Sequence, residues 1–66
     1  LDRLTARERE VAEALSRGLT AAEVGDTLGI SVKTVEAHRG NVYRKLGIRN
    51  VAELTRLVSQ PSGRAI

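Results

Sequence analysis

The chain has 66 residues, contains no Cys, Met, Phe or Trp and one His, and carries a formal net charge of +3 at pH 7. This composition excludes a disulfide framework and a cysteine-ligated zinc site, and no apolar run approaches the roughly 20 residues that span a bilayer. The charge is uneven: residues 1–30 hold four basic and six acidic side chains, whereas residues 31–66 hold seven basic and two acidic ones. We therefore expect the second half to bind an anionic partner, the alternative being an unevenly charged soluble surface.

Two capping boxes open the first two predicted helices. The hydroxyl of Thr5 and the carboxylate of Glu8 are spaced to satisfy each other's free backbone N–H groups, and Thr20 and Glu23 repeat the pattern. Apolar residues recur at helical spacing after each box, as at Val24. Each helix is expected to end at a glycine, the two being Gly18 and Gly29.

Two further helices follow. Ser31 is a typical N-cap for a third helix, which Gly47 is expected to end. Asn50 and Glu53 open a fourth helix, and Pro61 is expected to close it.

These elements predict an all-α domain, a compact four-helix bundle that contains a helix-turn-helix. Without Phe, Trp or Met, and with Tyr43 as the single aromatic residue, the core must be built from Leu, Val, Ile and Ala, which favours closely packed helices. Only Gly29 and Ile30 separate the second helix from the next cap, as is typical of two helices that meet at roughly 90–120°. We expect the domain to occupy residues 1–59 and residues 60–66 to form a flexible tail.

The third predicted helix has two very different sides. On a helical wheel, Val35, Val42 and Leu46 cluster within about 40° of one another. The opposite side is basic at its ends and nearly flat at its centre, and it comprises Lys33, Ala37, Gly40 and Arg44.

A basic and flat helix surface suits the major groove of DNA. The groove is about 12 Å wide, so small residues at the centre of the helix let its backbone approach the base edges. Lys33 and Arg44 then reach guanine edges or phosphates, and Glu36 is suited to accept a hydrogen bond from a cytosine amino group. The alternative is that Ala37 and Gly40 allow close packing against another protein helix.

Several flanking residues are candidates for phosphate contact. Thr20 and Ser31 lie at helix N-termini, where free N–H groups and the helix dipole favour an anion, although simple capping also explains them. Lys45 lies about 80° from the buried edge, which suits a flanking phosphate. Arg39 is interpreted either as a phosphate contact or as a structural rim residue. His38, beside the apolar edge, is expected to be packed and hydrogen-bonded.

Three stretches of the chain resemble the LuxR-type helix-turn-helix domain, especially the FixJ/NarL branch of bacterial response regulators. They are LTAREREV at 4–11, the GLT–AEV segment at 18–24 and LGISVKTVEAHRGNVYRKLG at 28–47. The resemblance covers about residues 4–58. It implies a DNA-binding output domain whose third helix, about residues 32–46, recognises DNA and whose fourth helix dimerises.

The resemblance also implies roles for individual residues. The positions that contact bases in the family are Lys33, Glu36, Ala37 and Gly40. Those that tend to meet phosphates are Thr34 and Lys45. Those that would supply an apolar dimer face are Val51, Leu54 and Val58.

The chain departs from the family at several of its own positions. Ala21 and Ala22 replace a common Asn-Lys pair, and Gly25 replaces a common alanine, which lowers helix propensity by up to about 1 kcal/mol. Glu36 and Gly40 replace lysines with which some relatives contact bases.

The resulting expectation is a transcriptional regulator that binds operator DNA as a homodimer, on two half-sites about one helical turn apart. By the same resemblance, an N-terminal regulatory domain is missing from this chain, RNA polymerase is a candidate partner, and the protein is cytoplasmic, on the nucleoid. No cofactor or metal is expected. No enzyme is expected either, because no nucleophile–base pair or Gly-rich phosphate loop is present.

Two other functions remain open at this stage. One is a helical adaptor that keeps the fold without specific DNA binding, although an adaptor has no need for Lys33, Arg44 and Lys45 around a flat centre. The other is RNA binding, for which the single aromatic residue, Tyr43, offers little stacking platform.

Overall fold

The computed structural model describes residues 3–59 of the chain. These residues form the helices α1 (Ala6–Ser16), α2 (Ala21–Leu28), α3 (Val32–Leu46) and α4 (Val51–Ser59), with no strand among them. The all-α prediction, with its helix-turn-helix, is therefore confirmed. Pro61 and the predicted tail at 60–66 lie outside the described residues.

Local hydrogen bonds explain where the first helices begin. The backbone N–H of Glu8 donates to Thr5 Oγ1 at 3.1 Å, and the N–H of Thr5 donates to Glu8 Oε1 at 3.0 Å. Thr20 and Glu23 make the same reciprocal pair at 3.1 and 2.8 Å. Both predicted capping boxes are thus confirmed, and each satisfies two N–H groups that the helix itself leaves free.

The later helices are also capped where the sequence predicts. The N–H of Thr34 donates to Ser31 Oγ at 3.1 Å, and the N–H of Glu53 donates to Asn50 Oδ1 at 2.9 Å. The carboxylate of Glu53 accepts from the backbone of Arg49, at 2.7 Å, so this cap is not a reciprocal box. α3 ends at Gly47, whose φ of +67° is one that residues with a Cβ rarely adopt.

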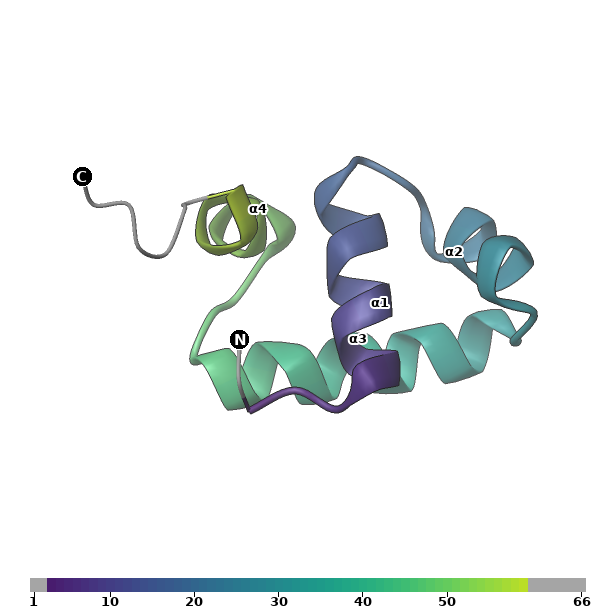
Figure 1. Ribbon diagram of the computed structural model, residues 1–66, viewed down its shortest axis with the longest axis horizontal. Helices are drawn as coiled ribbons and strands as arrows, with labels where there is room; N and C mark the ends of the chain where they lie inside the picture. Colours follow the sequence, from purple (N-terminus) through teal and green to yellow (C-terminus); the bar gives the residue numbers. More distant parts are fainter. Residues whose placement is uncertain (1–2, 60–66) are drawn as a thin grey trace.

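The helix α1 lies at the centre of the fold (Figure 1) and packs against α2, α3 and α4. α3 runs along one side of the molecule and crosses α1 steeply, while α2 and α4 lie on opposite sides of α1. All four helices contribute to the core. Its largest fully buried side chains are Val11, Val24, Val35, Val42 and Leu54.

The turn between α2 and α3 depends on close contact with Gly25. The N–H of Ile30 donates to the carbonyl oxygen of Gly25 at 2.9 Å. A Cβ added at Gly25 would lie 2.6 Å from the carbonyl oxygen of Ile30, and backbone at that distance would have to move. The sequence interpretation treated Gly25 only as a weak helix former. In the fold, its missing side chain lets the turn close onto α2.

Within residues 3–59, no helix is both long enough and apolar enough to cross a membrane.

Candidate nucleic-acid interface

The two sides of α3 that the sequence predicts are also distinct in the structure. Val35 and Val42 are completely buried, and Leu46 is half-buried against the core. On the other side, the side chains proposed for base contact lie on the surface: Lys33, Glu36 and Ala37 are exposed, and Gly40 is half-buried. The bundle therefore holds α3 by its apolar side and leaves the flat basic side accessible. We refer to Lys33, Ala37, Gly40 and Arg44 as the open side of α3.

Packing within the domain does not explain why the open side is flat at Gly40. A Cβ built at Gly40 would find no atom within 4 Å, apart from its chain neighbours and the backbone of its own helix. The described part of this chain therefore gives no steric reason for a glycine there. Since glycine in a helix interior destabilises it by roughly 0.5–1 kcal/mol relative to alanine, the choice points to an external ligand that approaches closely.

The hydroxyls proposed for phosphate contact are used as caps. Ser31 Oγ accepts from the N–H of Thr34 and lies 2.9 Å from Thr34 Oγ1. Thr20 Oγ1 accepts from the N–H of Glu23. Because Thr20, Ser31 and Thr34 are all exposed, capping leaves these groups accessible to an anion.

Arg44 is oriented by a neighbour on its own helix. Its Nη2 donates to Asn41 Oδ1 at 2.6 Å, and the residue is exposed. Only one of the five guanidinium N–H donors is needed for this bond, so the others are available to an anion. Arg39 is half-buried, at the border of the open side.

Lys45 has a partner that the sequence did not predict. Its Nζ lies 2.8 Å from Oε1 of Glu8, a carboxylate that also accepts the capping hydrogen bond from Thr5. The hydrogen bond from Lys45, followed by that from the Thr5 backbone, lowers the pKa of Glu8 below its ordinary value of 4.5. This ion pair joins the first turn of α1 to the last turn of α3. The role of Lys45 in phosphate contact stays a prediction.

His38 is half-buried, as expected for a residue beside the apolar edge. However, its Nδ1 is buried without a hydrogen-bond partner. The expected packing of His38 is therefore observed, whereas the expected hydrogen bond is not made at this nitrogen.

The fourth helix exposes only part of the apolar face assigned to dimerisation. Val51 is 38% exposed and Val58 is half-buried, but Leu54 is 0% exposed. This burial corrects the assignment of Leu54, whose side chain completes the core and offers no surface to a partner subunit. Leu57, which was not assigned to the dimer face, is 37% exposed and borders a hollow of about 260 Å³ with Leu46 and Ile48.

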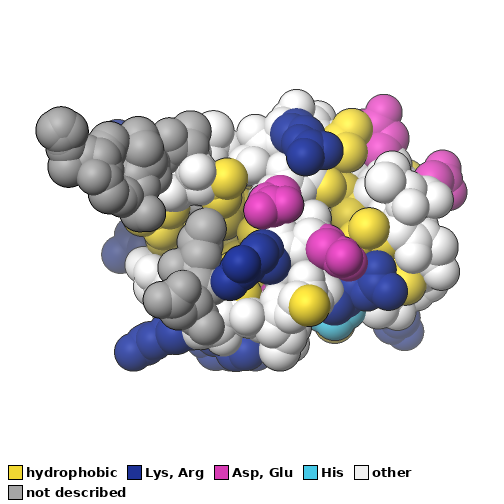
Figure 2. Space-filling model, in the orientation of Figure 1, with side chains coloured by type: hydrophobic (Ala, Val, Ile, Leu, Met, Phe, Trp, Pro, Cys, Tyr) yellow, Lys and Arg dark blue, Asp and Glu magenta, His cyan; other side chains and the backbone are white. Residues whose placement is uncertain are grey.

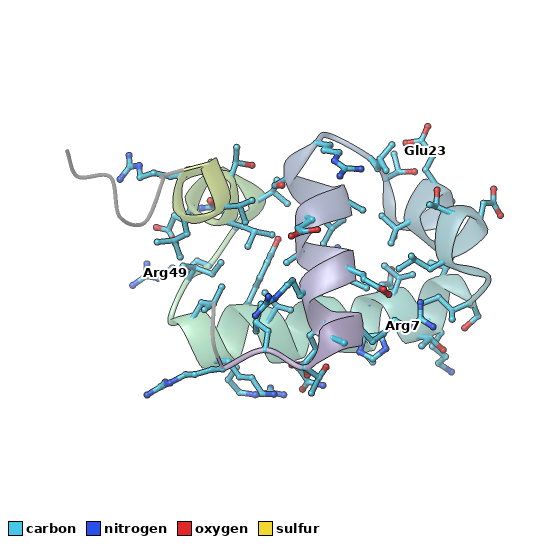
Figure 3. All side chains as sticks on the ribbon, viewed as in Figure 1. Arg7, Glu23 and Arg49 are labelled. Carbon is cyan, nitrogen blue, oxygen red and sulfur yellow. The ribbon has the colours of Figure 1, made fainter. Side chains whose placement is uncertain are left out.

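Charge distinguishes α3 from its neighbour α2. α3 carries four basic side chains and one acidic one, whereas α2 carries two acidic side chains and no basic one. In the view of Figure 2, the visible acidic side chains lie over α1 and α2, and basic side chains line the edge formed by α3. Figure 3 shows that Glu23 points outward on α2, away from α3, and that Arg49 points outward beyond the end of α3.

Residues 3–59 contain no group of three His, Cys, Asp or Glu side chains that could hold a metal ion. Arg7 is paired with Glu10 at 3.0 Å on the exposed surface of α1. The open side of α3 combines accessibility, basic charge and a flat centre.

Comparison with known proteins agrees with this geometry. Residues 2–58 match the family model "Bacterial regulatory proteins, luxR family". The chain is 51% identical over 55 residues to the transcriptional regulatory protein UhpA of Escherichia coli K12, covering 83% of the chain and 28% of UhpA. It is 41% identical over 59 residues to the transcriptional regulatory protein TdiR of Thauera aromatica, covering 89% of the chain and 26% of TdiR.

A third relative is the tetrathionate response regulatory protein TtrR of Salmonella typhimurium, 40% identical over 53 residues, which cover 80% of the chain and 26% of TtrR. The chain therefore spans about a quarter of the length of these curated relatives. No solved structure matches it. The chain belongs to the LuxR family of bacterial regulatory proteins, as a helix-turn-helix DNA-binding domain and not an enzyme.

Proposed function

We propose that this chain binds double-stranded DNA sequence-specifically, with α3 in the major groove, as the output domain of a bacterial transcriptional regulator. The observation that carries the proposal is the open side of α3, where Gly40 has no packing neighbour and basic residues lie at both ends. A helix that approaches base edges closely needs this combination of a flat centre and cationic ends.

Individual residues take distinct parts in this proposal. Lys33 and Glu36 lie in the N-terminal half of α3, the half that contacts base edges in helix-turn-helix proteins. Lys33 is suited to the acceptors of guanine and Glu36 to the amino group of cytosine. Arg44, already oriented by Asn41, contacts a phosphate, as do the N-caps Thr20 and Ser31 and the adjacent Thr34. Arg39 contacts a phosphate from the border of the open side.

The regulatory setting rests on the relatives. Because the matched segment makes up only 28% of UhpA and 26% of TtrR, and TtrR is a response regulatory protein by name, we infer that an N-terminal regulatory domain controls the DNA-binding domain. We infer that the whole protein is a two-component response regulator. It acts on the bacterial nucleoid in the cytoplasm, with RNA polymerase as a further partner.

Dimerisation would use the exposed part of the apolar face of α4, at Val51 and Val58. The substitution Val58→Asp should weaken self-association, because it places a charge in an apolar contact, and should leave the monomer folded. Sedimentation measures the first effect and circular dichroism the second. If the parent chain is monomeric at every concentration tested, the dimer proposal fails for this chain.

Selection of bound sequences from a random duplex pool, at two salt concentrations, tests the function itself. The expected result is an enriched motif whose half-sites are about one helical turn apart. On the selected duplex, Lys33→Ala should weaken binding by about 1–3 kcal/mol and relax base choice at one position. Enrichment of no motif, with binding abolished by moderate salt, would contradict sequence-specific recognition. An absence of binding to any duplex would favour the adaptor function.

A further inference from the structure

The N-terminal segment of the chain reaches the C-terminal end of α3. Nη1 of Arg3 donates a long hydrogen bond, 3.4 Å, to the backbone carbonyl oxygen of Lys45 in the last turn of the helix. The two residues are 42 positions apart in the chain. Arg3 is exposed, and its guanidinium retains further N–H donors beyond this one bond.

Arg3 adds to the cationic character of this end of α3, where Arg44 is also exposed. Glu8 lies 2.8 Å from the ammonium of Lys45 and balances its charge. Within residues 3–59, Arg3 has no acidic partner, unlike Arg7, which pairs with Glu10, and Lys45, which pairs with Glu8. Arg3 therefore adds a positive charge, unpaired within the described residues, beside the last turn of α3.

The length of α3 places this end near the rim of the groove. A helix of 15 residues is about 22 Å long. The major groove is about 12 Å wide, and the N-terminal residues of a recognition helix are the ones that contact base edges. The last turn of α3 is then directed toward the flanking sugar-phosphate strand, which is where a guanidinium with unused donors is most effective.

We propose that Arg3 is part of the DNA interface and binds a backbone phosphate beside the C-terminal end of α3. This inference rests on the proposed function and extends it to a residue outside the helix-turn-helix. Arg3 thereby contacts a phosphate at the C-terminal end of α3, as the caps of α2 and α3 do at its N-terminal end. The domain then binds both DNA strands that border the groove.

The test is the salt dependence of binding to a mixed-sequence duplex two helical turns long, measured by fluorescence anisotropy. Arg3→Gln keeps a donor for the Lys45 carbonyl and removes the charge, whereas Arg3→Lys keeps the charge. Arg17→Gln is the matched control, because Arg17 follows α1 at the end remote from α3 (Figure 1). Thermal unfolding of each variant reports whether the fold is retained.

Loss of one phosphate contact reduces the slope of log K against log salt by about 0.9, which corresponds to about eightfold weaker binding near 0.1 M salt. We expect this change in Arg3→Gln, little change in Arg3→Lys, and the parental slope in Arg17→Gln. An unchanged slope in Arg3→Gln would overturn the inference and leave Arg3 as a helix cap only, while the proposed function would stand. Failure of the parent chain to bind any duplex would overturn both.

Discussion

Two glycines inside helices, Gly25 in α2 and Gly40 in α3, contrast the packed and the open regions of this small domain. A Cβ at Gly25 would collide with the backbone of the turn, 2.6 Å away, whereas a Cβ at Gly40 would have no neighbour within 4 Å outside its own helix. The first glycine serves the fold and the second does not. A helix-weakening residue retained without a packing reason is informative about function, because its cost in stability has no compensation within the described chain.

The same contrast holds between the two sides of α3. The buried side, with Val35 and Val42, fixes the helix against α1 and α2. The open side, with Lys33 and Arg44 at its ends, contributes no side chain to the core. The bundle thus acts as a support that presents one helix surface, and substitutions on the two sides should affect different measurements.

The largest expected effect on stability is a loss, caused by the substitution Gly25→Ala in the packed region. The methyl group forces the backbone at Ile30 to move, an overpacking that costs about 1–3 kcal/mol, of which better helix propensity offsets up to about 1 kcal/mol. Chemical denaturation should show a net loss of stability. An unchanged or raised midpoint would show that the turn opens freely and that Gly25 is not needed for packing.

A smaller effect on stability, this time a gain, is expected from the substitution Gly40→Leu on the open side. Leucine has a higher helix propensity, and its Cβ would have no neighbour within 4 Å outside its own helix, so the free energy of unfolding should rise by up to about 1 kcal/mol. That gain corresponds to at most about 4–8 °C in Tm for a domain of this size. Binding to the selected duplex should weaken by about 1–3 kcal/mol, because the bulky side chain separates the helix from the base edges. Retained affinity would mean that Gly40 does not face the DNA.

The smallest effect concerns the border between the two sides, where Glu8 holds Lys45. The pKa of Glu8 is lowered in the folded state, so its charged form contributes stability above the ordinary value of 4.5, and that contribution is lost as the pH falls through the lowered pKa. Thermal unfolding across acidic to neutral pH should show the parent and Glu8→Gln differing most above pH 4.5 and converging below it. Parallel curves would show that the ion pair does not contribute.

The parts of this structure that sequence predicts well are local. Capping by Thr5, Thr20 and Ser31 involves residues three positions apart, so the pattern of the chain alone identifies it. The periodicity of α3 identifies its buried and open sides for the same reason. The open side, and with it the candidate site, was therefore accessible to prediction.

What sequence missed depends on contacts between distant segments. The pairing of Lys45 with Glu8 spans 37 positions, and nothing in the spacing of either residue signals it. The burial of Leu54 depends on how α4 docks against α1, which the apolar stripe of α4 does not specify. From the sequence, Gly25 is only a residue of low helix propensity in α2. Its packing role depends on the backbone of the following turn, which approaches it only in the folded structure.

The most direct test of the account is an amide chemical-shift titration of this chain with the selected duplex. The prediction is that the largest shifts cluster in α3, at Lys33, Ala37, Gly40 and Arg44, with smaller ones at the caps of α2 and α3. Largest shifts on α4, or around Arg17 at the far end of α1, with α3 unaffected, would contradict the claim that the open side of α3 is the DNA-binding surface.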